Sequence, residues 1–93
     1  MPQVAHVDVG STPVDLSDGL TAGLYVAQPV ASYAEMGDRA VLYATAEEAP
    51  SDDDYFRAGH RDFFTFRAGA GCEPTWAKTS ADHLTVPVAL ARA

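Results

Sequence analysis

The last part of the chain has its clearest alternation of hydrophobic and polar positions. In residues 83–90, HLTVPVAL, every second side chain is a leucine or a valine. Successive side chains of an extended strand point to opposite faces, so this period of two predicts a strand with one buried face. Pro87 has no amide hydrogen to give to a neighbouring strand. It therefore predicts an edge or a bulge on one side of this strand.

The same alternation predicts strands along most of the sequence. In residues 4–9, Ala5, Val7 and Val9 share one face, and the more polar positions between them share the other. Further strands are predicted at residues 24–28, 40–45, 62–67 and 74–79, separated by turns rich in Gly, Pro, Asp and Ser. No segment has a convincing helical pattern. We therefore expect an all-β fold, a small antiparallel sandwich or barrel of about six to seven short strands.

Length and composition set the scale of the molecule. The chain of 93 residues has no linker, which predicts a single domain over 1–93, with residues 1–12 as an N-terminal arm or an edge strand. The apolar fraction of 47% is enough for one compact core but not for a deep substrate cavity as well. A domain of this size is marginally stable alone, so association with partners is expected.

Charge and cysteine content limit the kinds of partner and the cellular compartment that the sequence is compatible with. Thirteen acidic residues against six basic ones give a formal net charge of −7, which repels nucleic acid and acidic membrane surfaces. Cys72 is the only cysteine, so no intramolecular disulfide is expected. The N-terminal sequence MPQVAHVDVG lacks the pattern of a signal peptide, and no apolar run reaches the length of a membrane span. These features predict synthesis in a reducing cytosol.

Catalytic and metal-binding patterns are absent from the sequence. None of the five serines lies in a G-x-S-x-G motif, and Glu73 next to Cys72 makes that thiol a poor nucleophile. The histidines and the cysteine do not have metal-ligand spacing, and residues 52–54 lack the spaced ligands of a calcium loop. We therefore expect no enzyme activity, and no catalytic, cofactor-binding or metal-binding residue.

The segment at residues 55–69, YFRAGHRDFFTFRAG, contains the tetrapeptide FRAG twice. Structural repeats need units of about 20 residues or more in several copies, so these two copies are not a repeat. Instead, each phenylalanine is expected to end a strand, and each Ala-Gly pair to form a turn.

The same segment contains half of the basic side chains, Arg57, Arg61 and Arg67. Phe63 lies on the face opposite Phe64 and Phe66, so we expect a loop, an arm or a neighbouring subunit to cover it. Arginine and aromatic residues are enriched at protein interfaces. The candidate interface consists of Arg57, Arg61, Phe63, Arg67, Trp76, Val4, Val7 and Val9. In the alternative interpretation, the arginines pair with residues 52–54 and cap the sheet.

A second type of surface is also compatible with the sequence. A row of aromatic residues on one face of a sheet would form a platform for carbohydrate. The candidates are Tyr25, Tyr33, Tyr43, Tyr55 and Trp76. Aromatic residues in small β domains are more often part of the core or of an interface.

The order of these features carries a family resemblance. The strand LYVAQ at residues 24–28 is followed by the strand VLYATA at 41–46 and an acidic Ala/Pro-rich turn. A Gly-His turn, the aromatic strand 63–66, a Gly-rich turn, Pro74-x-Trp76 and a final Leu/Val strand come next. This order resembles a group of short virion proteins of tailed bacteriophages, over residues 20–92. Pro29 replaces the asparagine that follows glutamine in that group, and Ala58-Gly59 replaces its Pro-Gly turn.

The resemblance implies a structural role on a phage particle. We expect a non-enzymatic virion protein, assembled in the host bacterial cytoplasm, that decorates or cements the capsid exterior through contacts between subunits. Its partners would be the major capsid protein or neighbouring tail or neck subunits, and a homo-oligomer is expected, with a trimer as the candidate state. No cofactor, nucleic acid or membrane is expected. Residues 4–9 would add to a neighbour's sheet as a strand. The alternative is a tail or baseplate module that binds a host-surface glycan.

Overall fold

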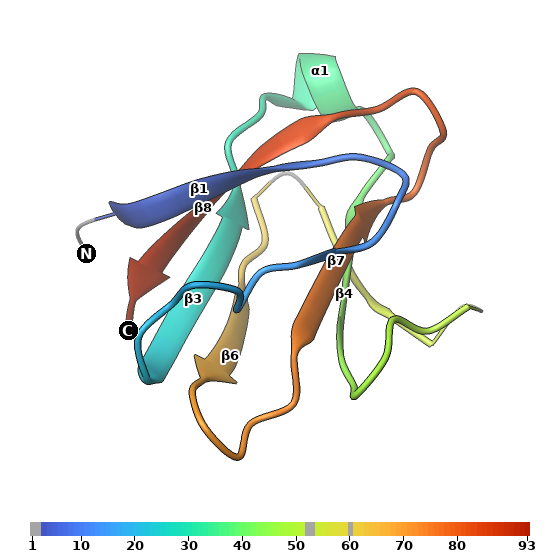
Figure 1. The fold of residues 1–93 in the computed structure, drawn as a ribbon. Helices are drawn as coiled ribbons and strands as arrows, with labels where there is room; N and C mark the ends of the chain where they lie inside the picture. Colours follow the sequence, from blue (N-terminus) through green and yellow to red (C-terminus); the bar gives the residue numbers. More distant parts are fainter. Residues whose placement is uncertain (1–2, 52–53, 60) are drawn as a thin grey trace.

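The computed structural model describes residues 3–51, 54–59 and 61–93 and shows an all-β fold. Two four-stranded antiparallel sheets pack face to face as a sandwich (Figure 1). The first sheet has the strand order β1-β8-β3-β6 and the second has the order β2-β7-β4-β5. The predicted all-β sandwich is confirmed. The described part of the chain contains eight strands rather than six or seven.

The strands differ in length between the two sheets. The strands of the first sheet are β1 (Gln3–Val9), β8 (Val86–Arg92), β3 (Gly23–Pro29) and β6 (Phe64–Ala68). The strands of the second sheet are β2 (Val14–Asp15), β7 (Thr75–Thr79), β4 (Val41–Thr45) and β5 (Phe56–Ala58). With two and three residues, β2 and β5 are too short to give an alternating pattern, and the sequence therefore did not predict them as strands.

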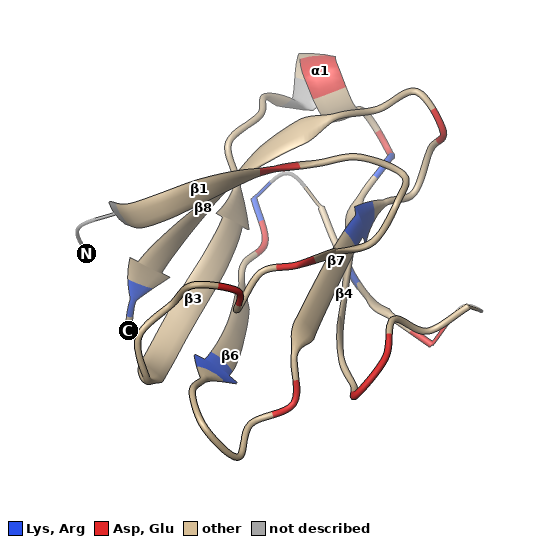
Figure 2. Cartoon of the chain, viewed as in Figure 1, with Lys and Arg blue, Asp and Glu red and all other residues tan. Residues whose placement is uncertain are grey.

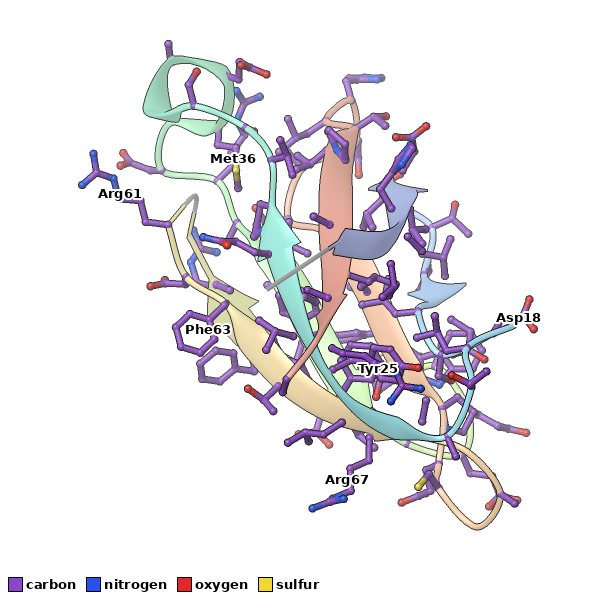
Figure 3. All side chains as sticks on the ribbon, turned by 90° about the vertical axis from the view of Figure 1, so that its left-hand side faces the viewer. Asp18, Tyr25, Met36, Arg61, Phe63 and Arg67 are labelled. Atoms are coloured by element: carbon purple, nitrogen blue, oxygen red, sulfur yellow. The ribbon has the colours of Figure 1, made fainter. Side chains whose placement is uncertain are left out.

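One short helix was also not predicted. Helix α1 (Tyr33–Met36) follows Ser32, whose Oγ accepts the amide of Glu35 at 3.3 Å. The Glu35 carboxylate in turn accepts the amide of Ser32, which completes a capping box. The buried side chain of Met36 points from this helix into one end of the sandwich (Figure 3).

Strand β8 shows how the alternating pattern forms the core. Val86, Val88 and Leu90 are buried, as the period of two predicts. However, β8 lies between β1 and β3, so it is not an edge strand. The Pro87 carbonyl accepts the amide of Val30 at 2.7 Å, which places the Pro87 nitrogen at the end of β3, where pairing stops. The missing amide hydrogen therefore removes little from the ladder, and the predicted edge is wrong. The β1–β8 ladder does contain a register shift between Gln3 and Ala5, so an irregularity is present on one side of β8, but it lies at the other end of the strand from Pro87.

Strand β1 is an edge strand of the first sheet. It pairs with β8 of the same chain, which brings Gln3 opposite Ala91, near the C-terminal end of β8 (Figure 1). Val9 is fully buried, and Ala5 and Val7 pack against the core. Gln3–Val9 therefore belong to the domain and are not a detached arm.

The FRAG tetrapeptides have different roles in the two sheets. Phe56 begins β5, and Phe66 lies in the middle of β6, so the expectation that each phenylalanine ends a strand is wrong. Ala58 and Ala68 each end a strand and are buried, and each is followed by a glycine. The shared feature is thus a small buried residue at the last position of a strand.

Candidate functional site

The structure separates the predicted interface residues into four places. Arg57 in β5 and Trp76 in β7 face outward from the second sheet, and Arg67 faces outward from β6 in the first sheet. Arg61 and Phe63 lie in the connection from β5 to β6. The three valines are in β1 at the opposite edge of the first sheet, and are Val4, Val7 and Val9. Val9 is fully buried, so its assignment to an interface is wrong.

An exposed aromatic surface lies where β5 and β6, the edge strands of the two sheets, come together. We call Phe56, Phe63 and Phe64 the aromatic edge. Phe63 is 62% exposed and Phe56 is 57% exposed, and both are among the large exposed hydrophobic residues of the described chain. The Phe64 ring stacks on Tyr43 with centroids 4.9 Å apart and meets the Phe56 ring at 5.8 Å. Figure 3 shows Phe63 pointing away from the domain.

Two arginines flank the aromatic edge. Arg61 and Arg67 are exposed, and their side chains point outward near opposite ends of this side of the domain (Figure 3). Neither has a hydrogen bond or an ion pair with a residue that the structure describes. The alternative in which residues 52–54 pair with the arginines concerns positions 52 and 53, which lie outside the described residues. In the sequence, Arg61 lies two positions before Phe63 and Arg67 three positions after Phe64.

The acidic residues occupy other parts of the surface. Figure 2 shows most of them in the loops between strands, whereas Lys and Arg mark the ends of β6, β7 and β8. The chain has an excess of seven negative charges, so the few cationic positions are distinct local features of an acidic surface.

A shallow hollow of about 500 Å³ lies on the outer face of the second sheet. In the strand pairing, Leu42 lies opposite Arg57 on one side and opposite Lys78 on the other. The Lys78 Nζ lies 4.5 Å from the centre of the Tyr55 ring. The hollow is lined by Ser11, Leu42, Tyr55, Arg57, Lys78, Thr79, Ser80 and Asp82. No local sequence pattern indicates this site, because its residues come from several segments that only the sheet order brings together.

At least two of the five candidate platform residues are not available at the surface. Tyr25 and Tyr43 are buried on the inner faces of the two sheets. Trp76 is partly buried and donates its indole N–H to the carbonyl of Ala46 at 3.0 Å. The side chain of Tyr33 lies outside the described part. Tyr25 and Tyr43 therefore cannot stack against a carbohydrate at the surface.

Tyr43 is an unusual core residue. Its hydroxyl is buried and has no hydrogen-bond partner among the described residues. Burial raises the pKa of Tyr43 well above its ordinary value, because the interior disfavours the phenolate. By contrast, the Tyr25 hydroxyl donates to the carbonyl of Thr21 at 2.6 Å. The Tyr43 ring therefore packs against the Phe64 ring, while the Tyr43 hydroxyl stays buried without a hydrogen-bond partner among the described residues.

The described residues contain no cluster of three or more His, Cys, Asp or Glu side chains with the geometry of a metal site. In the same part of the chain, no helix has the length and apolar character needed to span a membrane. Cys72 is exposed in the turn after β6. Comparison of the chain with protein-family models, curated proteins and solved structures finds no match.

Proposed function

We propose that this chain is a non-enzymatic structural protein of a bacteriophage virion that attaches to neighbouring subunits through the aromatic edge. The observation that carries the proposal is the exposure of Phe56 and Phe63 beside the partly buried Phe64. Complete burial of one phenylalanine side chain contributes about 1.5–3 kcal/mol. Covering both exposed rings with a partner is therefore favourable, and Arg61 and Arg67 fit a rim that selects a partner with acidic groups.

The sequence resemblance supplies the phage context for this proposal. The partners would be the major capsid protein or neighbouring tail or neck subunits, together with further copies of this chain. The net charge of −7 supports a position on the outside of the capsid, because it keeps the domain away from packaged DNA. We place the protein among those that decorate or cement the shell. The alternative, a glycan-binding tail module with a tyrosine platform, is weakened by the burial of Tyr25 and Tyr43.

Mass spectrometry of purified particles tests this function. Particles would be prepared from the phage that encodes the chain, with the wild-type chain, with Phe56→Ser and Phe63→Ser combined, or with Val30→Ser. Val30 is 57% exposed and lies outside the aromatic edge, so it is a matched control. We expect the wild-type and Val30→Ser chains at a fixed ratio to the major capsid protein. The double variant should fall by about tenfold or more, as expected for loss of roughly 1.4 kcal/mol.

Two results would reject the proposal. The first is absence of the wild-type chain from purified particles. The second is full retention of the double variant, which would show that the aromatic edge does not hold the chain on the particle. Circular dichroism of the purified variants confirms that a loss of occupancy does not come from unfolding.

A further inference from the structure

The hollow on the second sheet brings together cationic groups that are scarce in this chain. Lys78 is the only lysine, and Arg57 is one of five arginines. Both flank Leu42 in the strand pairing, so their side chains rise from the same face of the sheet. Their backbones are two strand spacings apart, about 10 Å, a distance that two long side chains can bridge around one anionic group.

Neither cation is neutralised by a carboxylate in the described chain. Arg57 donates from Nη2 to the backbone carbonyl of Asp38, and Lys78 lies over the Tyr55 ring. No ion pair joins Arg57 or Lys78 to a carboxylate of a described residue. Arg57 has further N–H groups, and the Lys78 ammonium has three, so both retain donors for a ligand.

Ser80 and Asp82 also line the hollow, and neither carries a positive charge. The Ser80 Oγ accepts the amide of Ala40 at 2.9 Å, which leaves its own O–H to donate. Asp82 also lines the hollow and supplies only acceptors when ionised. Inorganic phosphate carries only one or two O–H donors near about pH 7, and its dianion is repelled by Asp82 more strongly than a single carboxylate is. A neutral sugar can accept hydrogen bonds from the two cations but brings no negative charge to pair with them. A ligand with one carboxylate and several hydroxyls matches both sides.

We propose that this hollow binds a sugar acid, with its carboxylate between Arg57 and Lys78 and its hydroxyls directed to Asp82 and Ser80. The volume of about 500 Å³ is in the range of small-molecule sites. The Tyr55 ring forms one wall. The site is separate from the aromatic edge and does not depend on the proposed structural role.

NMR titration of the labelled domain with glucuronate tests the proposal. The expected result is saturable shifts of backbone amides around the hollow, at Leu42, Arg57, Lys78 and Ser80. Glucose matches the ring without the carboxylate, and inorganic phosphate matches the charge without the ring. We expect both to bind about tenfold more weakly or worse, because each lacks one set of charge-assisted contacts.

Three variants each remove one positive charge. Their comparison separates binding in the hollow from a general electrostatic attraction between glucuronate and the protein. Lys78→Gln and Arg57→Gln should each weaken glucuronate binding by about tenfold. Arg67→Gln is the matched control, because Arg67 is exposed on the other sheet, and it should leave binding unchanged. The proposal is overturned by the absence of shifts with glucuronate, by equal binding of glucose or phosphate, or by an equal effect of Arg67→Gln. Glucuronate binding is measured on the isolated domain, whereas the proposed function is measured as occupancy on particles, so failure here is distinguishable from failure of the proposed function.

Discussion

Two phenylalanines three positions apart have opposite environments in this domain. Phe66 is buried and stacks on Tyr25 with ring centroids 5.8 Å apart, whereas Phe63 is exposed. We expect Phe66→Ala to lower the free energy of unfolding by about 3–5 kcal/mol, because it leaves a cavity between the sheets. Phe63→Ala should change it by about 0.5 kcal/mol or less. Urea denaturation of the two variants measures the difference, and similar losses would contradict the exposure of Phe63.

The buried Tyr43 hydroxyl links stability to alkaline pH. Burial raises the pKa of Tyr43 in the folded state, whereas a tyrosine in the unfolded chain has a pKa of about 10. The folded state therefore keeps a proton that the unfolded state loses. Stability should be unaffected below about pH 10 and should fall above it by up to about 1.4 kcal/mol per pH unit. Denaturation of the wild type and Tyr43→Phe between about pH 8 and 11 measures this. Equal pH dependence in both proteins would contradict the assignment.

At the scale of single elements, the turn from β6 to β7 contains two glycines with positive φ but different surroundings. Gly69 has φ of 130°, and a Cβ built there would lie 2.8 Å from the Ala22 Cβ. Gly71 has φ of 83° with nothing within 4 Å of such a Cβ. Gly71→Ala should cost about 1 kcal/mol from backbone strain alone. Gly69→Ala should cost more, because a steric clash adds to the strain. The ratio of the two unfolding free energies checks this, and a larger loss in Gly71→Ala would contradict it.

Strand β1 is expected to be essential for folding. Deletion of residues 1–10 removes the partner of one side of β8 and exposes the core that Val9 covers. The truncated chain should lose its cooperative unfolding transition, because a small domain has only about 5–15 kcal/mol to lose. Val4→Ser changes an exposed position of the same strand and should leave the transition in place. A truncated chain that unfolds cooperatively would support the arm interpretation instead.

The elements also show which parts of the fold can be predicted from sequence. Alternation identifies β1 and β8, because each has a single buried face and at least one full period. Strands β2 and β5 carry no such signal, since a strand of two or three residues is recognised only through its partner. The capping box of α1 is visible in the sequence at Ser32 and Glu35, although its helix has only four residues. Whether Pro87 disturbs strand pairing depends on where β3 ends, and no local sequence pattern specifies that end.

At the scale of the whole molecule, function depends on which strands become neighbours. The sequence places Phe63 on the face opposite Phe64 and Phe66 and predicts a cover for it, but Phe63 is 62% exposed, so no loop or arm among the described residues covers it. Phe56 was missed, because its exposure results from the position of β5 at the edge of the second sheet. The hollow was missed for the same reason, since Arg57 and Lys78 are 21 positions apart and meet only across β4. Long-range strand order therefore determines both surfaces.

The central claim is that the aromatic edge is the surface that contacts other virion subunits. Photo-crosslinking in assembled particles tests it most directly, with a photoreactive phenylalanine analogue placed at position 63 or, as a control, at position 30. Both positions are exposed in the domain, so the probe itself does not disturb the core. We predict crosslinks from position 63 to a second virion chain and no crosslinks from position 30. Crosslinks from position 30 alone, or none from position 63, would contradict the account.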